Sequence, residues 1–173
     1  MSLQNGKKIM IKGDPAKLKK VSVSLPFGLG SAEWEADSTQ RRAAWALYVE
    51  LVTRVAVQEL ANDAGLVREA MNSLYTLFGT TREILREAGP DVGASRESVG
   101  GLAISVLNQG LRPFLTKWHP QLQIWEARRP HEKGLKEHEQ SWSEESTLRQ
   151  ELATLRGELE VYAQALAKVA GVD

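Results

Sequence analysis

The sequence contains no cysteine among its 173 residues. This absence excludes disulfide bonds, thiolate zinc sites, iron–sulfur clusters and a cysteine nucleophile. Histidine is scarce, and its three residues lack the spacing of a zinc site, so we expect no metal and no other cofactor. Charge of one sign is not in excess, because 22 basic residues balance 22 acidic ones. A cysteine-free chain is compatible with the cytoplasm, where we expect the protein to reside.

Long apolar runs are absent as well. The longest uncharged stretch covers 98–111, fourteen residues that include three glycines. A helix needs about 20 mostly apolar residues to cross a bilayer, so no membrane association is expected. Lysines interrupt the first twenty residues, and no export signal is predicted there. The composition, 42% hydrophobic and 25% charged, is that of a single globular domain over 1–173.

Residues 7–25 carry the only β pattern of the sequence. A short apolar run over 9–11 is followed by a turn-like segment, and residues 21–25 then alternate between apolar residues and serine. Alternation with a period of two is typical of a half-buried strand. We predict a β-hairpin over 7–25 that ends before the glycines of 26–30 and packs on helices or on a second copy.

The rest of the chain has the apolar spacing of helices, and we expect a helical core over 38–129. Asp37 has the residue type and position of a helix cap. The apolar positions of 44–60 lie on more than one face of the first helix. This pattern predicts a central helix that is mostly covered by its neighbours.

A second apolar stripe runs from Val67 to Ala88, and Gly79 leaves open whether it forms one helix or two. A third apolar stripe follows Ser95, which is the predicted cap of its helix. Pro113 and Pro120 lie inside this stripe. Because proline removes a backbone donor and crowds the preceding turn, both residues are expected to bend or break the helix.

Residues 130–141 are polar and are predicted to form a loop. The segment 142–170 has the clearest helical pattern, since its apolar residues alternate by four and three as in a heptad repeat. We name these residues the leucine seam: Leu148, Leu152, Leu155, Leu159, Tyr162, Leu166 and Val169. The predicted fold class is mainly α, an antiparallel bundle of four to five helices with an N-terminal β-hairpin and a long C-terminal helix.

One stretch, 112–129, concentrates side chains that bind ligands. Tryptophan beside guanidinium is suited to stacking a planar ring or holding an anion. The candidate ligand-binding residues are Arg112, Lys117, Trp118, His119, Trp125 and Arg128. In a structural interpretation, the two tryptophans instead cover one end of the core while the basic side chains reach into water.

No catalytic motif accompanies this stretch. Gly28 and Gly30 follow a strand, but Glu33 stands where a dinucleotide-binding loop has its third glycine. Paired carboxylates such as Glu158 and Glu160 are two residues apart on a helix and point in different directions. We assign no catalytic residues and expect a protein that is not an enzyme.

Charge is unevenly distributed along the chain. Six lysines stand against one aspartate in 1–20, and nine acidic residues stand against five basic ones in 130–173. The candidate interaction surface combines the leucine seam with the N-terminal lysines, Lys7, Lys8, Lys12, Lys17, Lys19 and Lys20. A long apolar seam and ends of opposite charge favour self-association as a homodimer, or docking on another protein.

Three functions follow in order of preference. The first is a non-catalytic protein-interaction, regulatory or assembly module. The second is a small-molecule or nucleotide-sensing domain that uses the 112–129 cluster. The third is a nucleic-acid-binding accessory protein that uses the N-terminal lysines, which the net charge of zero disfavours.

Overall fold

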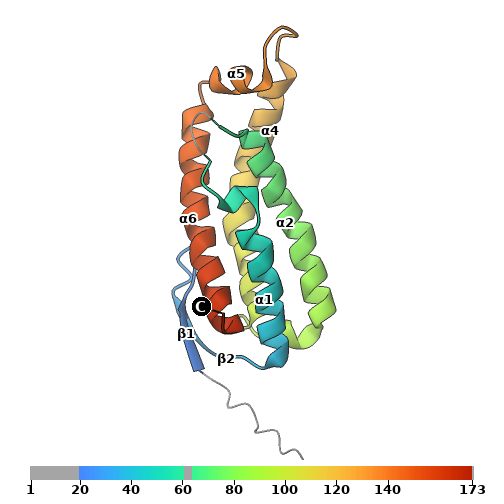
Figure 1. The fold of residues 1–173 in the computed structure, drawn as a ribbon, viewed down its shortest axis with the longest axis vertical. Helices are drawn as coiled ribbons and strands as arrows, with labels where there is room; N and C mark the ends of the chain where they lie inside the picture. Colours follow the sequence, from blue (N-terminus) through green and yellow to red (C-terminus); the bar gives the residue numbers. More distant parts are fainter. Residues whose placement is uncertain (1–19, 61–63, 173) are drawn as a thin grey trace, which may run out of the picture.

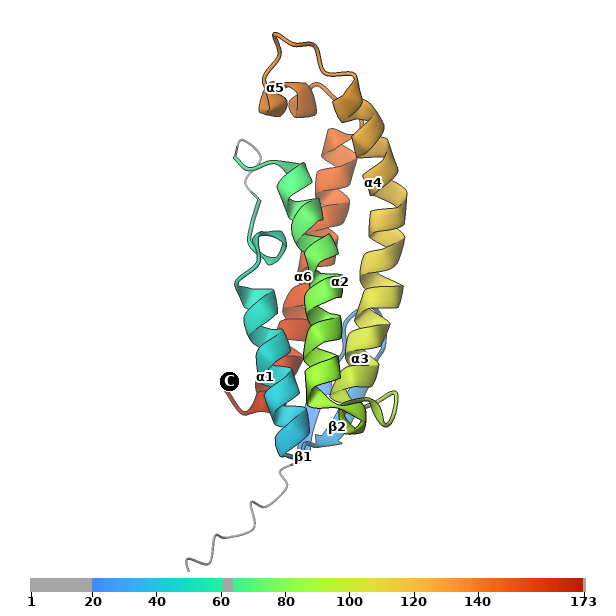
Figure 2. The same cartoon turned by 90° about the vertical axis from the view of Figure 1, so that its right-hand side faces the viewer.

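The computed structural model describes residues 20–60 and 64–172, and 70% of them lie in helices. The elements are β1 (Lys20–Ser24), β2 (Ser31–Glu35), α1 (Ser38–Val52), η1 (Val55–Val57), α2 (Val67–Ala88), η2 (Pro90–Gly93), α3 (Val99–Ser105), η3 (Val106–Leu111), α4 (Arg112–Ala127), α5 (Leu135–Gln140) and α6 (Glu145–Ala170). Four long segments, α1, α2, the continuous run from α3 to α4, and α6, form an antiparallel bundle (Figure 1, Figure 2). The predicted fold class is confirmed.

The leucine seam of α6 forms the centre of the core. All seven of its side chains are buried, and Leu159 and Leu166 are fully enclosed. Burial of a leucine side chain contributes about 1.5–3 kcal/mol, so the seam is a main source of stability. α1 packs along α6 (Figure 1). The seam is therefore covered within one chain and is not available to a partner.

The third helical stripe continues through both of its prolines. Its buried residues recur at 106, 110, 114, 118 and 122, a spacing of four that drifts around a helix of 3.6 residues per turn. η3 is a π-helical stretch, whose wider turn absorbs this drift and keeps the residues facing the core. Pro113 directly follows the π-helical stretch and Pro120 lies inside α4, and neither residue ends the helical run. The predicted break at Pro120 is therefore wrong.

Of the two predicted helix caps, the one at Asp37 is confirmed and the one at Ser95 is wrong. Asp37 caps α1, its carboxylate accepting the Gln40 N–H at 2.8 Å. The α3 cap is Ser98 rather than Ser95, because the Ser98 hydroxyl accepts the Gly101 N–H at 3.1 Å. The Gln40 side chain also accepts the Val99 N–H at 2.9 Å, which ties the start of α3 to α1.

The described β-hairpin spans 20–35, whereas most of the range predicted for it, 7–25, lies outside the described residues. β1 pairs antiparallel with β2 in the register Val21 opposite Trp34, and 26–30 form the connecting loop instead of the end of the hairpin. The apolar residues of β2 are Ala32 and Trp34, which alternate with Ser31, Glu33 and Glu35, so its apolar pattern is weak in the sequence. The predicted strand at 9–11 lies outside the described residues.

The hairpin loop is fixed to the bundle through Phe27. The Phe27 N–H donates to the Glu158 carboxylate of α6, and the Phe27 ring occupies the space beside Gly110, where a Cβ atom would overlap the ring. Phe27 has a positive φ of 56°, a strained value for a non-glycine residue. These contacts anchor the hairpin on the outside of α6 and η3.

The predicted loop over 130–141 contains the short helix α5, which lies across one end of the bundle (Figure 1). Leu135, Glu137 and Gln140 of this helix are exposed, but His138 and Glu139 are buried. The Glu139 carboxylate accepts the Val67 N–H at 2.9 Å at the start of α2. Leu66, the N-cap of α2, provides no side-chain bond, so Glu139 replaces it from a distant part of the chain.

Candidate functional site

A groove runs along α6 because α1 is too short to cover it. α1 has 15 residues and α6 has 26, and beyond Val52 the chain continues as η1 and an irregular segment (Figure 2). Several β-branched residues follow residue 51, and these lower the helix propensity there. Arg54 then fixes the chain to α2 by donating to the Thr80 hydroxyl at 2.9 Å. The predicted first helix, with a pattern that extends to residue 60, is therefore shorter.

The part of this groove between α1 and α6 is mainly apolar. It encloses about 540 Å³. Its apolar lining consists of Tyr48, Val52, Val57, Ala163, Ala167 and Val172. Glu160, Gln164 and Lys168 stand along α6 beside these residues. This part of the groove therefore has an apolar floor with a polar and charged rim.

The apolar surface continues from the groove onto α1. Trp45 and Val49 have exposed fractions of 48% and 36%, and the Trp45 ring stacks on Tyr48 with 5.8 Å between the centroids. Together with Val52 they form an apolar stripe at helical positions i, i+3, i+4 and i+7, which we name the uncovered face of α1. The opposite face, formed by Ala43, Ala44, Leu47 and Leu51, is buried in the bundle. α1 therefore has two apolar faces, and the prediction that it is mostly covered is wrong.

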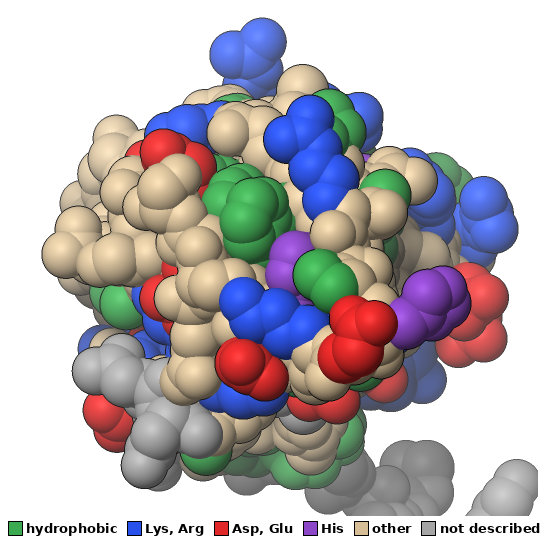
Figure 3. Space-filling view, turned by 90° about the horizontal axis from the view of Figure 1, so that it is seen from above, with side chains coloured by type: hydrophobic (Ala, Val, Ile, Leu, Met, Phe, Trp, Pro, Cys, Tyr) green, Lys and Arg blue, Asp and Glu red, His purple; other side chains and the backbone are tan. Residues whose placement is uncertain are grey.

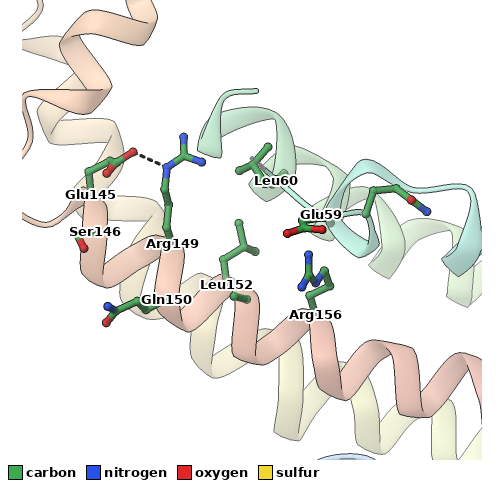
Figure 4. Close-up of a pocket in the computed structure, with 12 residues that line it drawn as sticks. Glu59, Leu60, Glu145, Ser146, Arg149, Gln150, Leu152 and Arg156 are labelled. Atoms are coloured by element: carbon green, nitrogen blue, oxygen red, sulfur yellow. Dashed lines mark hydrogen bonds and ion pairs between the residues drawn. The ribbon is translucent and has the colours of Figure 1, made fainter. Parts of the chain in front are cut away.

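The other part of the groove lies between residues 56–60 and the first half of α6, and it is more polar. It encloses about 460 Å³ and meets the apolar part at Gln58. Glu59 and Arg156 point toward each other across it, while Leu60 and Leu152 provide apolar walls (Figure 4).

Arg149 is the most constrained charged residue of this polar part. Its guanidinium donates to the Glu145 carboxylate (Figure 4) and to the Glu139 carboxylate, the latter at 2.9 Å. The same guanidinium lies 3.4 Å from the Gly65 carbonyl oxygen. Arg149 thus joins α5, α6 and the chain before α2, and its charge stabilises the fold at this end of the groove.

The structure does not bring the six candidate ligand-binding residues into one pocket. Trp118 is 1% exposed, and its indole N–H donates to the Glu151 carboxylate at 2.7 Å. Lys117 pairs with the same carboxylate, and its ammonium lies 4.6 Å from the centre of the Trp118 ring. These bonds lower the pKa of Glu151 from its ordinary value, the Lys117 bond more than the Trp118 bond. The three side chains join α4 to α6.

Trp125 and His119 are engaged in two other contacts. The Trp125 ring stacks on His138 at 4.6 Å, and its indole N–H donates to the His138 carbonyl at 3.0 Å, which holds α5 against α4. His119 lies 3.1 Å from a guanidinium nitrogen of Arg68, which also binds Glu126. Trp125 lines a cavity of only about 60 Å³, too small for most ligands.

The two remaining candidates point to different surfaces. Arg128 is exposed near the end of the bundle that carries α5, where basic, acidic and histidine side chains are interspersed (Figure 3). Arg112 donates to the Asn108 side chain and contacts Phe78 of α2. Arg112 lines a cavity of about 390 Å³ with a different set of residues, which come mainly from α2.

Of the six N-terminal lysines in the candidate interaction surface, one is among the described residues. Lys20 is described and forms an exposed ion pair with Glu35 at 3.8 Å across the hairpin. Such a pair contributes at most about 1 kcal/mol. Lys7, Lys8, Lys12, Lys17 and Lys19 lie outside the described residues.

Across the described residues, no three side chains of the types that ligate metals form a group able to hold an ion. Within the same residues, no helix has the length and apolar character needed to cross a membrane. No family model, curated protein or solved structure matches the chain.

The groove and the uncovered face of α1 were missed from the sequence because they depend on where α1 ends. The feature of the sequence that could have predicted them is the second apolar face of α1. A helix of 15 residues that is apolar on two faces needs covering elements on both sides. In the described residues, the bundle provides one of them.

Proposed function

We propose that this chain is a non-catalytic assembly module that pairs with a second copy of itself through the uncovered face of α1. The observation that supports it most directly is the exposed apolar stripe, Trp45, Tyr48, Val49 and Val52, beside the apolar part of the groove. Contiguous apolar surface of this kind is uncommon on monomers and marks interaction sites. The cysteine-free sequence is consistent with our further proposal that the assembly forms in the cytoplasm.

A second copy is the occupant that fits the stripe best. Residues at positions i, i+3, i+4 and i+7 form a ridge that packs against another helix. In a two-fold dimer the same patch meets itself, so the α1 ridge of one copy would lie antiparallel to that of the other. The two-fold axis would pass near Tyr48 and Val49, at the centre of the stripe.

Charge complementarity supports this arrangement. Arg42 lies on the exposed surface of α1 near its start, and no described residue forms an ion pair or hydrogen bond with it. Glu160, half exposed on α6 and 3.5 Å from the Arg156 guanidinium of its own chain, lies beside Val52 at the other end of the stripe. Because the two-fold axis exchanges the ends of the stripe, Arg42 of one copy would face Glu160 of the other. Opposite charges around an apolar patch fix its register and steer association.

The direct test is the molar mass measured by size-exclusion chromatography with light scattering over a range of concentrations. We expect a dimer of about 38 kDa, twice the chain mass of 19.2 kDa. The Trp45→Glu variant should give the monomer mass while its circular dichroism stays helical, because the residue is exposed in the single chain. Ile124→Glu, which changes an equally exposed apolar residue on α4, serves as the control and should remain dimeric.

Exchanging the charges of Arg42 and Glu160 tests the register of the two α1 helices in the proposed dimer. Arg42→Glu should weaken the dimer, and the double variant Arg42→Glu with Glu160→Arg should restore it, because the exchange recreates the pair with opposite polarity. A wild-type chain that stays at the monomer mass at all concentrations would contradict the proposal. So would equal effects of Trp45→Glu and Ile124→Glu.

A further inference from the structure

A cavity of about 390 Å³ lies between α2 and α4, away from the α1–α6 groove. α2 contributes Tyr75, Phe78, Gly79 and Arg82 to its lining, and α4 contributes Arg112 and Thr116. The α2 residues are spaced i, i+3, i+4 and i+7, so they form one face of the helix. We name this space the arginine cavity.

Two arginines from different helices meet at one aromatic ring in this cavity. The guanidinium carbon of Arg82 lies 5.8 Å from the centre of the Phe78 ring, and that of Arg112 lies 5.4 Å from it. The π-helical stretch η3 ends directly before Arg112. π-helical turns occur frequently at functional sites.

The two positive charges lack a negative partner. No described residue that lines the cavity is acidic. Arg112 donates to the Asn108 amide oxygen at 3.1 and 3.2 Å, which leaves its charge uncompensated, and Arg82 forms no ion pair or hydrogen bond with the described residues. Like charges near one apolar ring repel each other, and an anion between them would relieve that repulsion. Guanidinium groups bind phosphate through paired hydrogen bonds.

The cavity also offers a surface for a planar group. Tyr75 is 44% exposed, lies one helical turn from Phe78 and contacts the His119 ring in a T-shaped arrangement with 4.9 Å between the centroids. A planar ring could stack on the exposed part of Tyr75 while an attached phosphate reaches the arginines. Gly79 keeps the wall between them open, since a Cβ atom there would meet nothing within 4 Å. Thr116 is exposed on the facing helix and lines the cavity, and a threonine hydroxyl is able to donate to a phosphate oxygen. The volume lies in the range of small-ligand sites.

We infer that the arginine cavity binds a phosphorylated compound with a planar ring, such as a nucleotide. Arg82 and Arg112 hold the phosphate oxygens, and Tyr75 stacks on the ring. This site is separate from the proposed dimer surface, so each inference can fail without the other.

The test is isothermal titration calorimetry with ATP, inorganic pyrophosphate and adenosine as probes. ATP and pyrophosphate should bind saturably, and adenosine should bind much more weakly because it lacks the phosphates. Arg82→Gln and Arg112→Gln should each weaken ATP binding by about tenfold or more. Tyr75→Ala should weaken ATP binding but leave pyrophosphate binding unchanged, which separates ring recognition from phosphate recognition.

Arg86→Gln is the matched control, since it removes an exposed arginine one turn further along α2 that does not line the cavity. This variant should bind ATP as the wild type does. Failure of both ATP and pyrophosphate to bind with a Kd below about 1 mM would overturn the inference. Binding that Arg82→Gln and Arg112→Gln leave unchanged would overturn it as well, because the anion would then be held elsewhere.

Discussion

Glu139 shows how a single buried carboxylate can hold three elements together. It comes from α5, is 6% exposed, accepts the Val67 N–H of α2 and pairs with Arg149 of α6. Glu139→Ala should lower the free energy of unfolding by about 3 kcal/mol, because it leaves a buried donor and a buried cation without this partner.

Urea unfolding monitored by circular dichroism measures this effect. Glu137→Ala removes an exposed carboxylate from the same helix and should change the unfolding free energy by less than about 0.5 kcal/mol. Equal losses in the two variants would mean that Glu139 contributes only through the helix propensity of α5.

A pair of glycine substitutions tests how the hairpin is attached. Gly110→Ala should destabilise the protein by about 1–2 kcal/mol, because the new methyl group would overlap the Phe27 ring. Gly157→Ala, on α6, should instead stabilise it by about 0.8 kcal/mol, since the added Cβ meets nothing and alanine is the better helix former. Thermal or urea unfolding of both variants checks the opposite signs. If Gly110→Ala is as stabilising as Gly157→Ala, Phe27 does not pack there in solution.

Tyr162 links stability to alkaline pH. Burial raises the pKa of its hydroxyl well above the ordinary value of 10.0. The folded chain keeps the hydroxyl neutral while the unfolded chain ionises it, so stability is intact below pH 10 and falls progressively as the pH rises further. The hydroxyl also has no hydrogen-bond partner among the described residues.

Tyr162→Phe should therefore raise the free energy of unfolding by about 1 kcal/mol at neutral pH and reduce its loss above pH 10. Tyr75→Phe, at an exposed position, is the control and should change neither quantity. Unfolding free energies measured by urea titration at several pH values give the result. A Tyr162→Phe variant that is less stable than the wild type at neutral pH would show that the hydroxyl has a partner.

At the scale of the elements, the sequence predicts best where one pattern is long and unambiguous. The seam of α6 and the stripe of α2 each run over six turns or more, and both helices are found where the pattern places them. α5 was missed because its stability comes from two buried residues, His138 and Glu139, whose partners lie far away in the sequence. β2 was missed because a strand of five residues is defined by its pairing with β1.

Pro120 allows a prediction about the stability of the helix α4. Pro120 is exposed inside α4, where it withholds one backbone donor from the helix. Pro120→Ala should raise the free energy of unfolding by about 1–3 kcal/mol, because it restores that bond. Pro90→Ala is the control: Pro90 begins η2, where proline is favourable, and its loss should be neutral or slightly destabilising. Chemical unfolding of both variants checks this, and a destabilising Pro120→Ala would show that α4 bends there in solution.

At the scale of the whole molecule, the candidate sites depended on which helices face each other. The 112–129 cluster has the residue types of a ligand site, yet helical geometry directs Trp118, Trp125 and Arg112 to three different neighbours. The arginine cavity requires Arg82, which is 30 positions away from Arg112 in the sequence. The sequence alone contains no information that joins them, because their proximity follows from the packing of α2 on α4.

The packing of the whole molecule also determines which apolar surface is left exposed for the proposed dimer. The leucine seam, which favoured self-association in the sequence, is buried within one chain, while an apolar face of α1 remains exposed. The argument for a second copy therefore rests on a different surface from the one that the sequence indicated.

The most direct test of this central claim is disulfide crosslinking at position 49. The chain has no cysteine, so a single substitution provides a unique thiol. Val49 lies near the proposed two-fold axis, where the two copies of the residue would approach closely enough for a disulfide. We predict that Val49→Cys forms a covalent dimer under mild oxidation, whereas Ile104→Cys, exposed on α3, stays monomeric on a denaturing gel. Equal and low yields of covalent dimer from both variants would contradict the proposed pairing of α1 with its own copy.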